Sequence, residues 1–361
     1  MQLAIDLAFA TKGQTSPNPS VGAIIVNNGK IAGVGTHLKS GEEHAEDLAL
    51  QMAGNKAKGA TLYVTLEPCS HFGKRPPCIN FIIESGIKRV VIGSKDKNPL
   101  VAGKGIRELQ NANIEVETGI LKEKTDQLNQ EFNHFIRTNM PFVTLKTAIS
   151  LDGKMATSAG ESKWITGEDA RRDVHYYRHQ HDAILVGVGT ILKDDPLLTT
   201  RLPNGGKNPI RIILDHQLRT PIDARVIQDS SAETWIVTGG NISSKKIRLY
   251  EQNHVKIIDM ANGISLLDLL PRLGELGVTS LFVEGGATVN TIFLNSKLVN
   301  QMIVYIAPKL IGGSEAPTFF AGEGFQQMKD ALNLQLESVE RIGADIKIVA
   351  QPIHDKNVED E

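Results

Sequence analysis

The chain has 361 residues, a formal net charge of −2, and 41% hydrophobic and 22% charged residues. This length exceeds that of one ordinary hydrophobic core and favours two domains, and the composition is typical of globular proteins. A net charge so close to zero argues against a protein that neutralises many phosphates, so nucleic acid is not an expected partner.

The chain contains two cysteines, Cys69 and Cys78, which are too few for a disulfide framework in a protein of this size. Residues 1–13 include Asp6 and lack a basic start followed by an apolar run, so they predict an amphipathic helix rather than a signal peptide. No apolar segment approaches the length of a membrane span. We therefore expect a cytoplasmic protein without a membrane partner.

The first 139 residues alternate between helical and extended patterns, which predicts a layered α/β domain. Helices are expected at 3–12, 44–52, 79–85, 105–111 and 121–137. Strands are expected at 21–26, 31–35, 61–66, 89–92 and 114–116. The turn signal Asn27, Asn28, Gly29 joins the first two strands into a hairpin, so the sheet should be mixed.

Four residues of this half have the chemistry that activates a water molecule on zinc. His44 opens a predicted helix, Cys69 directly follows a predicted strand, and Cys78 precedes another helix. Each alone is usually a packed side chain, but together they offer three zinc ligands and leave a fourth position for water. Glu46 then supplies the carboxylate that moves protons.

The loop between the two cysteines is longer than in most zinc nucleobase deaminases, which carry His-x-Glu followed by Pro-Cys-x-x-Cys. Here eight residues separate the cysteines, and they include His71, Lys74 and Arg75. A cationic insert favours a phosphorylated substrate, and the alternative is a solvated loop. Asn18, held between two prolines, is either part of a rigid loop or an amide presented to a ligand.

A second domain is expected to begin at residue 140, giving domains 1–139 and 140–361. Its strands are expected at 142–148, 183–188, 210–214, 234–237, 255–258, 280–283, 334–339 and 344–350, its helices at 168–181 and 264–276, and a loop at 189–196. In the segment from Val283 to Asn290, a strand meets two glycines and then a helix. Such a junction lets backbone N–H groups approach a phosphate, although a tight strand–helix turn is the commoner meaning.

These motifs together resemble the bifunctional riboflavin-biosynthesis deaminase/reductase family. The first half carries the resemblance in Thr15–Gly22, in His44-Ala45-Glu46 and around the two cysteines; the second half carries it in Leu145–Lys154, Ser162–Thr166, Gly187–Thr190, Asp194–Pro196 and Glu284–Gly286. The resemblance implies a cytidine-deaminase-like three-layer α/β/α domain with a mixed sheet, followed by a dihydrofolate-reductase-like α/β domain.

The resemblance also implies two reactions. Zinc on His44, Cys69 and Cys78, with Glu46 as proton carrier, would deaminate 2,5-diamino-6-ribosylamino-4(3H)-pyrimidinone 5′-phosphate. NADPH would then reduce the ribosyl group to ribityl, giving 5-amino-6-ribitylamino-uracil 5′-phosphate. The competing hypotheses are a nucleobase or tRNA deaminase with a C-terminal binding domain, and a non-enzymatic protein with structural zinc.

Site residues follow from the resemblance, position by position. In the deaminase half the substrate contacts are Asn18, His37, His71 and Lys74. In the reductase half the substrate contacts are Lys146, Ser162, Arg178, Leu198, Arg201 and Glu284. The NADPH contacts are Ala148, Trp164, Thr166, Thr190, Asp194, Gly285, Gly286, Ala287, Thr288, Val289, Asn290, Thr291 and Ile292. The proton donor for reduction is open among Lys146, Asp194 and Glu284, and a homo-oligomer, dimer or tetramer, is expected.

Overall fold

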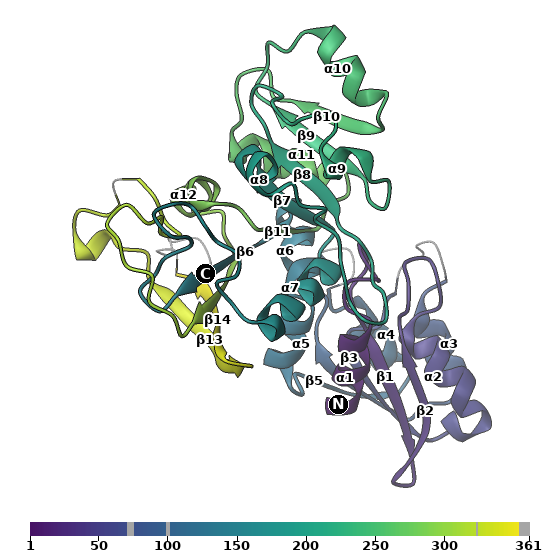
Figure 1. Cartoon of the computed structure of the whole chain (residues 1–361). Helices are drawn as coiled ribbons and strands as arrows, with labels where there is room; N and C mark the ends of the chain where they lie inside the picture. The colour runs from purple at the N-terminus through teal and green to yellow at the C-terminus, as the bar shows by residue number, and fades with distance from the viewer. Residues whose placement is uncertain (71–75, 99–101, 323, 354–361) are drawn as a thin grey trace. The chain divides into compact units, whose positions relative to one another are not determined.

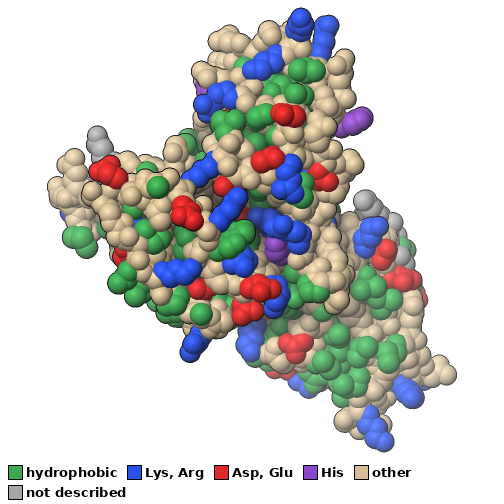
Figure 2. Space-filling view, in the orientation of Figure 1, with side chains coloured by type: hydrophobic (Ala, Val, Ile, Leu, Met, Phe, Trp, Pro, Cys, Tyr) green, Lys and Arg blue, Asp and Glu red, His purple; other side chains and the backbone are tan. Residues whose placement is uncertain are grey.

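The structure is a computed structural model that describes residues 1–70, 76–98, 102–322 and 324–353. The chain divides into two compact units, Met1–Asn139 and Met140–Glu361 (Figure 1). In the described part of the chain, no helix combines the length and apolarity that crossing a membrane would need. Figure 2 shows Lys and Arg side chains interspersed with Asp and Glu side chains over the visible face.

The first unit is built on a five-stranded mixed sheet with the order β2-β1-β3-β4-β5. Its strands are β1 Gly22–Asn27, β2 Lys30–Thr36, β3 Thr61–Leu66, β4 Arg89–Ser94 and β5 Glu115–Thr118. Its helices are α1 Gln2–Ala10, α2 Ala45–Ala53, the 3-10 turn η1 Gly54–Ala57, α3 Cys78–Glu84, α4 Lys104–Asn111, α5 Lys122–Leu128 and α6 Gln130–Thr138. The strands β3, β4 and β5 run parallel, while the hairpin β1–β2 supplies the antiparallel pairs, so the predicted mixed sheet is confirmed.

Helix α2 lies unusually close to the hairpin because two glycines on β2 face it. A Cβ atom at Gly33 would come within 2.1 Å of the Ala49 carbonyl oxygen, and one at Gly35 within 2.1 Å of the Ala45 carbonyl oxygen. Ala45, Ala49 and Ala53 are buried on the same side. Small residues on both surfaces therefore set the height of α2 above the sheet.

The prediction of one helix over 121–137 is wrong. The structure has two helices, α5 and α6, which are interrupted at Asn129, where φ is −113° and ψ is 25°. The side chain of Asn129 bonds to the backbone of Ser20 instead of projecting into solvent. A tertiary contact therefore overrides the helical pattern, which by itself runs through residue 129.

The second unit is a nine-stranded sheet with the order β10-β9-β8-β7-β11-β6-β12-β14-β13. Its strands are β6 Phe142–Ser150, β7 Ala183–Gly187, β8 Ile210–Leu214, β9 Thr234–Thr238, β10 Val255–Asp259, β11 Ser280–Val283, β12 Gln301–Ala307, β13 Leu334–Ile342 and β14 Asp345–Pro352. Its helices are α7 Glu168–Gln180, α8 Val188–Asp194, α9 Arg225–Gln228, α10 Ser244–Glu251, α11 Leu266–Glu275, α12 Ala287–Asn295 and the 3-10 turn η2 Met328–Asp330. The strands from β10 to β12 pair in parallel, and the hairpin β13–β14 closes the sheet in antiparallel pairs.

Two apolar clusters cover the two faces of this sheet. Helices α11 and α12 contribute to one, and α7, α8, α9 and α10 contribute to the other.

The prediction of a loop over 189–196 is wrong for its first part. These residues belong to helix α8, whose buried side chains Val188 and Ile191 are spaced three residues apart. Strand β12 was not predicted: it lies between β6 and β14 and is largely buried on both faces, so it lacks the alternation that marks a half-exposed strand.

Candidate functional site

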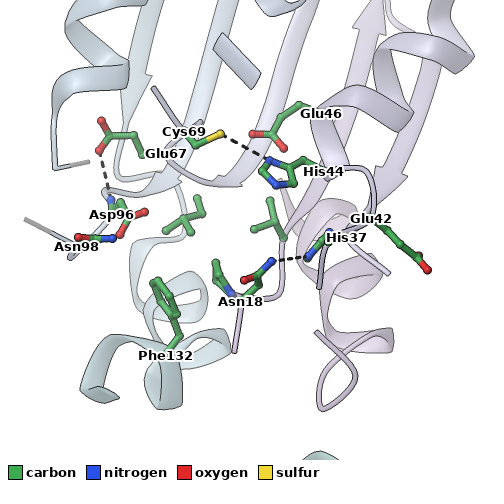
Figure 3. A pocket seen from close by; sticks show the side chains of 14 residues that line it. Asn18, His37, Glu42, His44, Glu46, Glu67, Cys69, Asp96, Asn98 and Phe132 are labelled. Carbon is green, nitrogen blue, oxygen red and sulfur yellow. Dashed lines mark hydrogen bonds between the residues drawn. The ribbon is translucent and has the colours of Figure 1, made fainter. Parts of the chain in front are cut away.

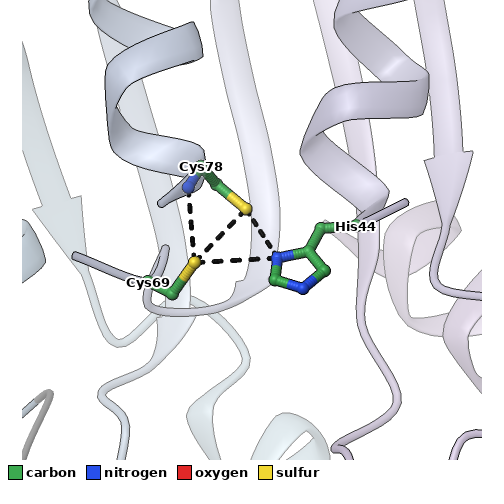
Figure 4. Close-up of side chains that lie close together, drawn as sticks. All are labelled: His44, Cys69 and Cys78. Carbon is green, nitrogen blue, oxygen red and sulfur yellow. Dashed lines mark hydrogen bonds between the residues drawn. The ribbon is translucent and has the colours of Figure 1, made fainter. Parts of the chain in front are cut away.

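Three side chains that are far apart in the sequence meet in the first unit (Figure 4). Cys69 Sγ lies 3.4 Å from Cys78 Sγ and 3.6 Å from His44 Nδ1, and Cys78 Sγ lies 2.7 Å from the same nitrogen. Tetrahedral zinc ligands lie about 3.5–3.8 Å apart at ordinary zinc–sulfur and zinc–nitrogen bond lengths. The Cys69–His44 separation lies within this range, the separation of the two sulfur atoms is slightly short of it, and the Cys78–His44 separation needs to open by less than about 1 Å.

The local structure explains why these atoms converge. His44 is the residue before α2, Cys78 is the first residue of α3, and Cys69 lies three residues beyond the end of β3. The backbone N–H of Cys78 also points at Cys69 Sγ, at 3.3 Å. The hydrogen bond between the two cysteine side chains, opposed by burial and reinforced by His44, lowers the pKa of Cys69 to about 4. The same hydrogen bond and burial raise the pKa of Cys78.

Glu46 lies beside this cluster and is only 4% exposed. Burial, and then the negative charge of Cys69, raise the pKa of Glu46 to about 7, against the opposing influence of His44. A carboxyl group with a pKa near neutrality can both accept and return a proton at working pH. Its position two residues after a metal ligand, on the same helix, suits it to a metal-bound water.

The cluster opens into a cavity of about 280 Å³ (Figure 3). Asn18, His37, His44, Glu46 and Cys69 all line it, so the structure brings together most of the residues expected for the deaminase half. His71 and Lys74 lie outside the described residues.

The hydrogen bonds of His37 fix how Asn18 faces the cavity. His37 Nδ1 lies 2.9 Å from the Glu43 carbonyl oxygen and must donate to it, so Nε2 is left as the acceptor. Asn18 Nδ2 lies 3.1 Å from that Nε2 and donates to it. Burial lowers the pKa of His37, which favours the neutral ring and leaves Nε2 free to accept this hydrogen bond. The carbonyl oxygen of the Asn18 amide is therefore the group that is oriented for a ligand.

Among the cavity residues that were not predicted from the sequence are Glu67, Asp96, Asn98 and Phe132. The Glu67 carboxylate accepts hydrogen bonds from the backbone N–H groups of Gly103 and Ile106, at 3.0 and 3.3 Å, and so binds the start of α4 to the end of β3. Its place directly after a buried parallel strand was the available signal. Phe132 is brought to the cavity by α6 and carries no local motif.

In the second unit, three of the expected substrate residues form one charged cluster. Arg178 Nε lies 2.6 Å from Glu284 Oε1, and Lys146 Nζ lies 3.6 Å from Glu284 Oε2. Arg178 Nη1 also donates to the Thr199 carbonyl oxygen at 3.0 Å. These side chains come from β6, α7 and the end of β11, and all three are largely buried.

The expected cofactor segment follows β11, which lies between β7 and β6. In parallel sheets, ligands bind beyond the carboxyl ends of such strands. A Cβ atom at Gly285 would come within 2.5 Å of Val289, whereas Gly286 meets nothing within 4 Å. Gly285 thus allows close packing, and exposed Gly286 leaves the N-terminus of α12 accessible.

Not every expected residue turns its side chain outward. Leu198 and Val289 are 3% and 8% exposed and pack in the core, so only their backbones are available to a ligand. Asn290 is buried and donates to the Phe319 carbonyl oxygen. Trp164 is 63% exposed and lies under the Arg171 guanidinium, 4.6 Å from it.

The remaining expected residues lie on several elements. Asp194, at the end of α8, has Lys163 Nζ 3.7 Å away, and Thr190 lies on the same helix. Arg201 is positioned through its backbone N–H, which lies 3.3 Å from His175 Nδ1. Others occur on β6, before α7 and along α12: Ala148, Ser162, Thr166, Ala287, Thr288, Thr291 and Ile292.

Comparison with known proteins identifies the family to which this chain belongs. Residues 1–94 match the cytidine and deoxycytidylate deaminase zinc-binding region, and residues 141–348 match the RibD C-terminal domain. The riboflavin biosynthesis protein RibD of Bacillus amyloliquefaciens is 51% identical over 362 residues, covering 100% of this chain and 97% of the relative. The chain belongs to the RibD family. RibD of Escherichia coli (strain K12) is 41% identical, with 96% of each chain covered.

Solved RibD structures agree over nearly the whole length. RibD of Acinetobacter baumannii (form 1) is 38% identical with a TM-score of 0.88, and 98% of each chain is covered. A diaminohydroxyphosphoribosylaminopyrimidine deaminase/5-amino-6-(5-phosphoribosylamino)uracil reductase from Thermotoga maritima is 36% identical with a TM-score of 0.87, covering 98% of this chain and 97% of that one.

The comparisons confirm the predicted fold class and family. The chain is a bifunctional enzyme of riboflavin biosynthesis, a zinc-dependent deaminase and an NADPH-dependent reductase. The hypotheses of a tRNA deaminase and of a non-enzymatic zinc protein are not favoured.

Proposed function

We propose that the unit Met1–Asn139 deaminates 2,5-diamino-6-ribosylamino-4(3H)-pyrimidinone 5′-phosphate, and that the unit Met140–Glu361 reduces the product to 5-amino-6-ribitylamino-uracil 5′-phosphate. One observation carries the first step: His44, Cys69 and Cys78 converge beside buried Glu46, at a cavity that also presents the Asn18 amide. The name of the Thermotoga maritima relative supports the substrate.

In the deaminase step, His44 Nδ1 and the two cysteine thiolates would hold a zinc ion, which would supply an acidified water beside Glu46. Glu46 would accept one proton of that water and pass it to the ring nitrogen. It would then carry the second proton, from the new hydroxyl on the attacked carbon, to the amino group, which leaves as ammonia. The Asn18 carbonyl oxygen accepts a hydrogen bond from the ring and orients it. His71 and Lys74 are proposed to bind the phosphorylated side of the substrate.

In the reductase step, bound NADPH supplies the hydride. Arg178 and Arg201 are proposed to bind the substrate phosphate, and the backbone from Gly285 to Ile292 is proposed to bind the cofactor, together with Ala148, Trp164, Thr166, Thr190 and Asp194. Ser162 and Leu198 are proposed to complete the substrate pocket.

Lys146 is the best candidate for the proton donor in the reduction. Burial lowers the pKa of Lys146, which makes its ammonium a better acid, although Glu284 opposes the shift. Glu284 itself is held ionised with a pKa of about 2 and has no proton to give near neutrality.

The deciding experiment assays the purified zinc-loaded chain on each of the two substrates separately. With the diamino substrate and no NADPH, we expect ammonia release and accumulation of the deaminated pyrimidine. With the deaminated compound and NADPH, we expect NADPH oxidation without ammonia release. Turnover of cytidine or of tRNA adenosine in place of the pyrimidine phosphate would contradict the proposal.

We further propose a homo-oligomer, dimer or tetramer, that works in the cytoplasm. The edge strand β13 supports association, because it exposes the apolar side chains of Leu336 and Val339. Light scattering coupled to gel filtration measures the assembly, and a monomer at micromolar concentration would exclude it.

A further inference from the structure

Asn129, at the interruption between α5 and α6, is bound to a loop more than one hundred residues earlier in the chain. Its Oδ1 accepts a hydrogen bond from the Ser20 N–H at 2.8 Å, and its Nδ2 donates to the Ser20 carbonyl oxygen at 3.0 Å. The side chain is 3% exposed. One carboxamide thus satisfies both backbone polar groups of one residue, as a neighbouring strand would.

This contact lies next to the cavity of the first unit. Ser20 follows Asn18 and Pro19, both of which line that cavity. Pro17 and Pro19 have no N–H to donate, so the loop offers few backbone groups by which the rest of the unit can hold it. Within the loop, the Asn18 N–H donates a hydrogen bond to the Thr15 carbonyl oxygen at 2.9 Å. The Asn129 contact fixes Ser20, at the far end of the loop, to the junction of α5 and α6, while the neighbouring Val21 is held to β2 and His37.

The same residue also brings an aromatic side chain to the cavity. Helix α6 restarts directly after Asn129, whose carbonyl oxygen accepts the hydrogen bond from the Asn133 N–H at 2.8 Å. Phe132 lies on the first turn of this new helix and lines the cavity with Asn18 (Figure 3). Asparagine has a lower helix propensity than alanine, so it is unfavourable at this position in a helical stretch. The two hydrogen bonds to Ser20, next to the cavity, account for its presence here.

We propose that Asn129 is a positioning residue of the deaminase site. Its carboxamide holds the loop so that the Asn18 amide stays bonded to His37 and its carbonyl oxygen faces the pyrimidine. The inference rests on the proposed function of the first unit, and it adds a residue that touches neither the metal ligands nor the cavity.

The test compares two variants with a matched control. Asn129→Ala removes both hydrogen bonds. Asn129→Asp keeps the size of the side chain and the acceptor for the Ser20 N–H, but turns a second oxygen toward the Ser20 carbonyl. Asn27→Ala is the control, because Asn27 Nδ2 also donates to a backbone carbonyl, that of Lys56 at 2.6 Å, in the same unit and away from the cavity residues.

For both Asn129 variants we expect the deaminase KM to rise about tenfold with little change in kcat, which is the signature of lost ligand orientation. Zinc content and reductase activity on the deaminated compound should stay at the wild-type level, and Asn27→Ala should change none of these. An unchanged KM in the Asn129 variants, or an equal loss in Asn27→Ala, would overturn the proposal.

A second measurement separates this inference from the proposed substrate. Long-range ¹⁵N NMR of the histidine rings reports whether His37 Nε2 still accepts a hydrogen bond, without any substrate present. We expect the His37 signal to shift in Asn129→Asp and to stay in place in Asn27→Ala. If the wild-type enzyme failed to deaminate the pyrimidine phosphate, the proposed function would fall. The NMR comparison would still decide whether Asn129 positions Asn18, and an unshifted signal would refute it.

Discussion

Arg178 holds Glu284 with two hydrogen bonds, from Nε to Oε1 at 2.6 Å and from Nη2 to Oε2 at 3.2 Å. Burial alone would raise the pKa of Glu284, but the charges of Arg178 and Lys146 outweigh it and lower the pKa to about 2. One buried carboxylate therefore faces two buried cations and balances one of their two charges, and it stays ionised throughout the pH range in which an enzyme works.

Glu284→Gln should leave Arg178 and Lys146 without a counter-charge. We expect the second unit to lose about 3 kcal/mol of unfolding free energy, the usual cost of breaking a buried ion pair, together with its reductase activity. Because the folded pKa lies below the ordinary value of 4.5, the stabilisation by Glu284 is complete above that pH and is lost as the pH falls toward 2. Urea unfolding at several pH values measures this, and a variant as stable as the wild type at pH 7 would contradict it.

Glu46→Gln should retain zinc, because Glu46 is not among the three converging ligands. Deaminase kcat should fall roughly 10²–10⁴-fold, the range that positioned proton transfer contributes. The second unit supplies an internal control, since NADPH oxidation with the deaminated compound should continue. Near-normal deamination by a zinc-replete variant would show that another group carries the proton.

Zinc binding should weaken as the pH falls. The metal needs Cys78 as a thiolate, and the pKa of that thiol is raised in the metal-free site. Each proton released on binding changes the zinc affinity about tenfold per pH unit. Competition with a chromophoric chelator at pH 6 and pH 8 measures the slope.

Removal of the zinc by the same chelator should abolish deamination, lower the unfolding midpoint of the first unit and spare the reductase. Parallel loss of both activities would point to a structural dependence of the second unit on the metal, which we do not expect.

The neutral form of His175 should make the second unit sensitive to mild acid. Burial, and then the charges of Arg178 and Arg201, lower the pKa of His175 to about 4, while its Nδ1 accepts the Arg201 N–H. The unfolded chain binds this proton near pH 6.5, so stability is lost as the pH falls from 6.5 toward 4. His175→Gln should show a shallower decline in urea midpoint over that range, and identical slopes would rule the effect out.

Local patterns in the sequence were sufficient to identify the three side chains that converge in the first unit, and most strands. Strand β3 is bounded at Thr61 and Leu66 as its apolar run predicts, and the turn at Asn28 and Gly29 adopts the positive φ values that a hairpin needs. Cys69 and Cys78 were recognisable because ligand chemistry restricts the choice of residue. In each case the information lies within a few neighbouring positions.

The residues that were missed depend on partners far away in the chain. Asn129 reads as an ordinary helix position until Ser20 is placed beside it, and Phe132 reaches the cavity only because of that interruption. Strand β12 is buried on both faces, so its sequence carries no alternation. The periodicity of apolar residues indicates which side of a helix or strand is buried. It does not indicate which distant residue a side chain contacts in the tertiary fold.

The close packing of α2 against the β1–β2 hairpin restricts which substitutions this enzyme can accept. His44 and Glu46 begin a helix whose height is set by Gly33 and Gly35, two residues that are not among those lining the cavity. A methyl group at either glycine would displace His44 and Glu46 together, and with them the proposed zinc ligand and the proposed proton carrier. We therefore expect new substrate preferences to arise by exchange of residues in the loop that bears Asn18, whereas Gly33 and Gly35 have almost no freedom to vary.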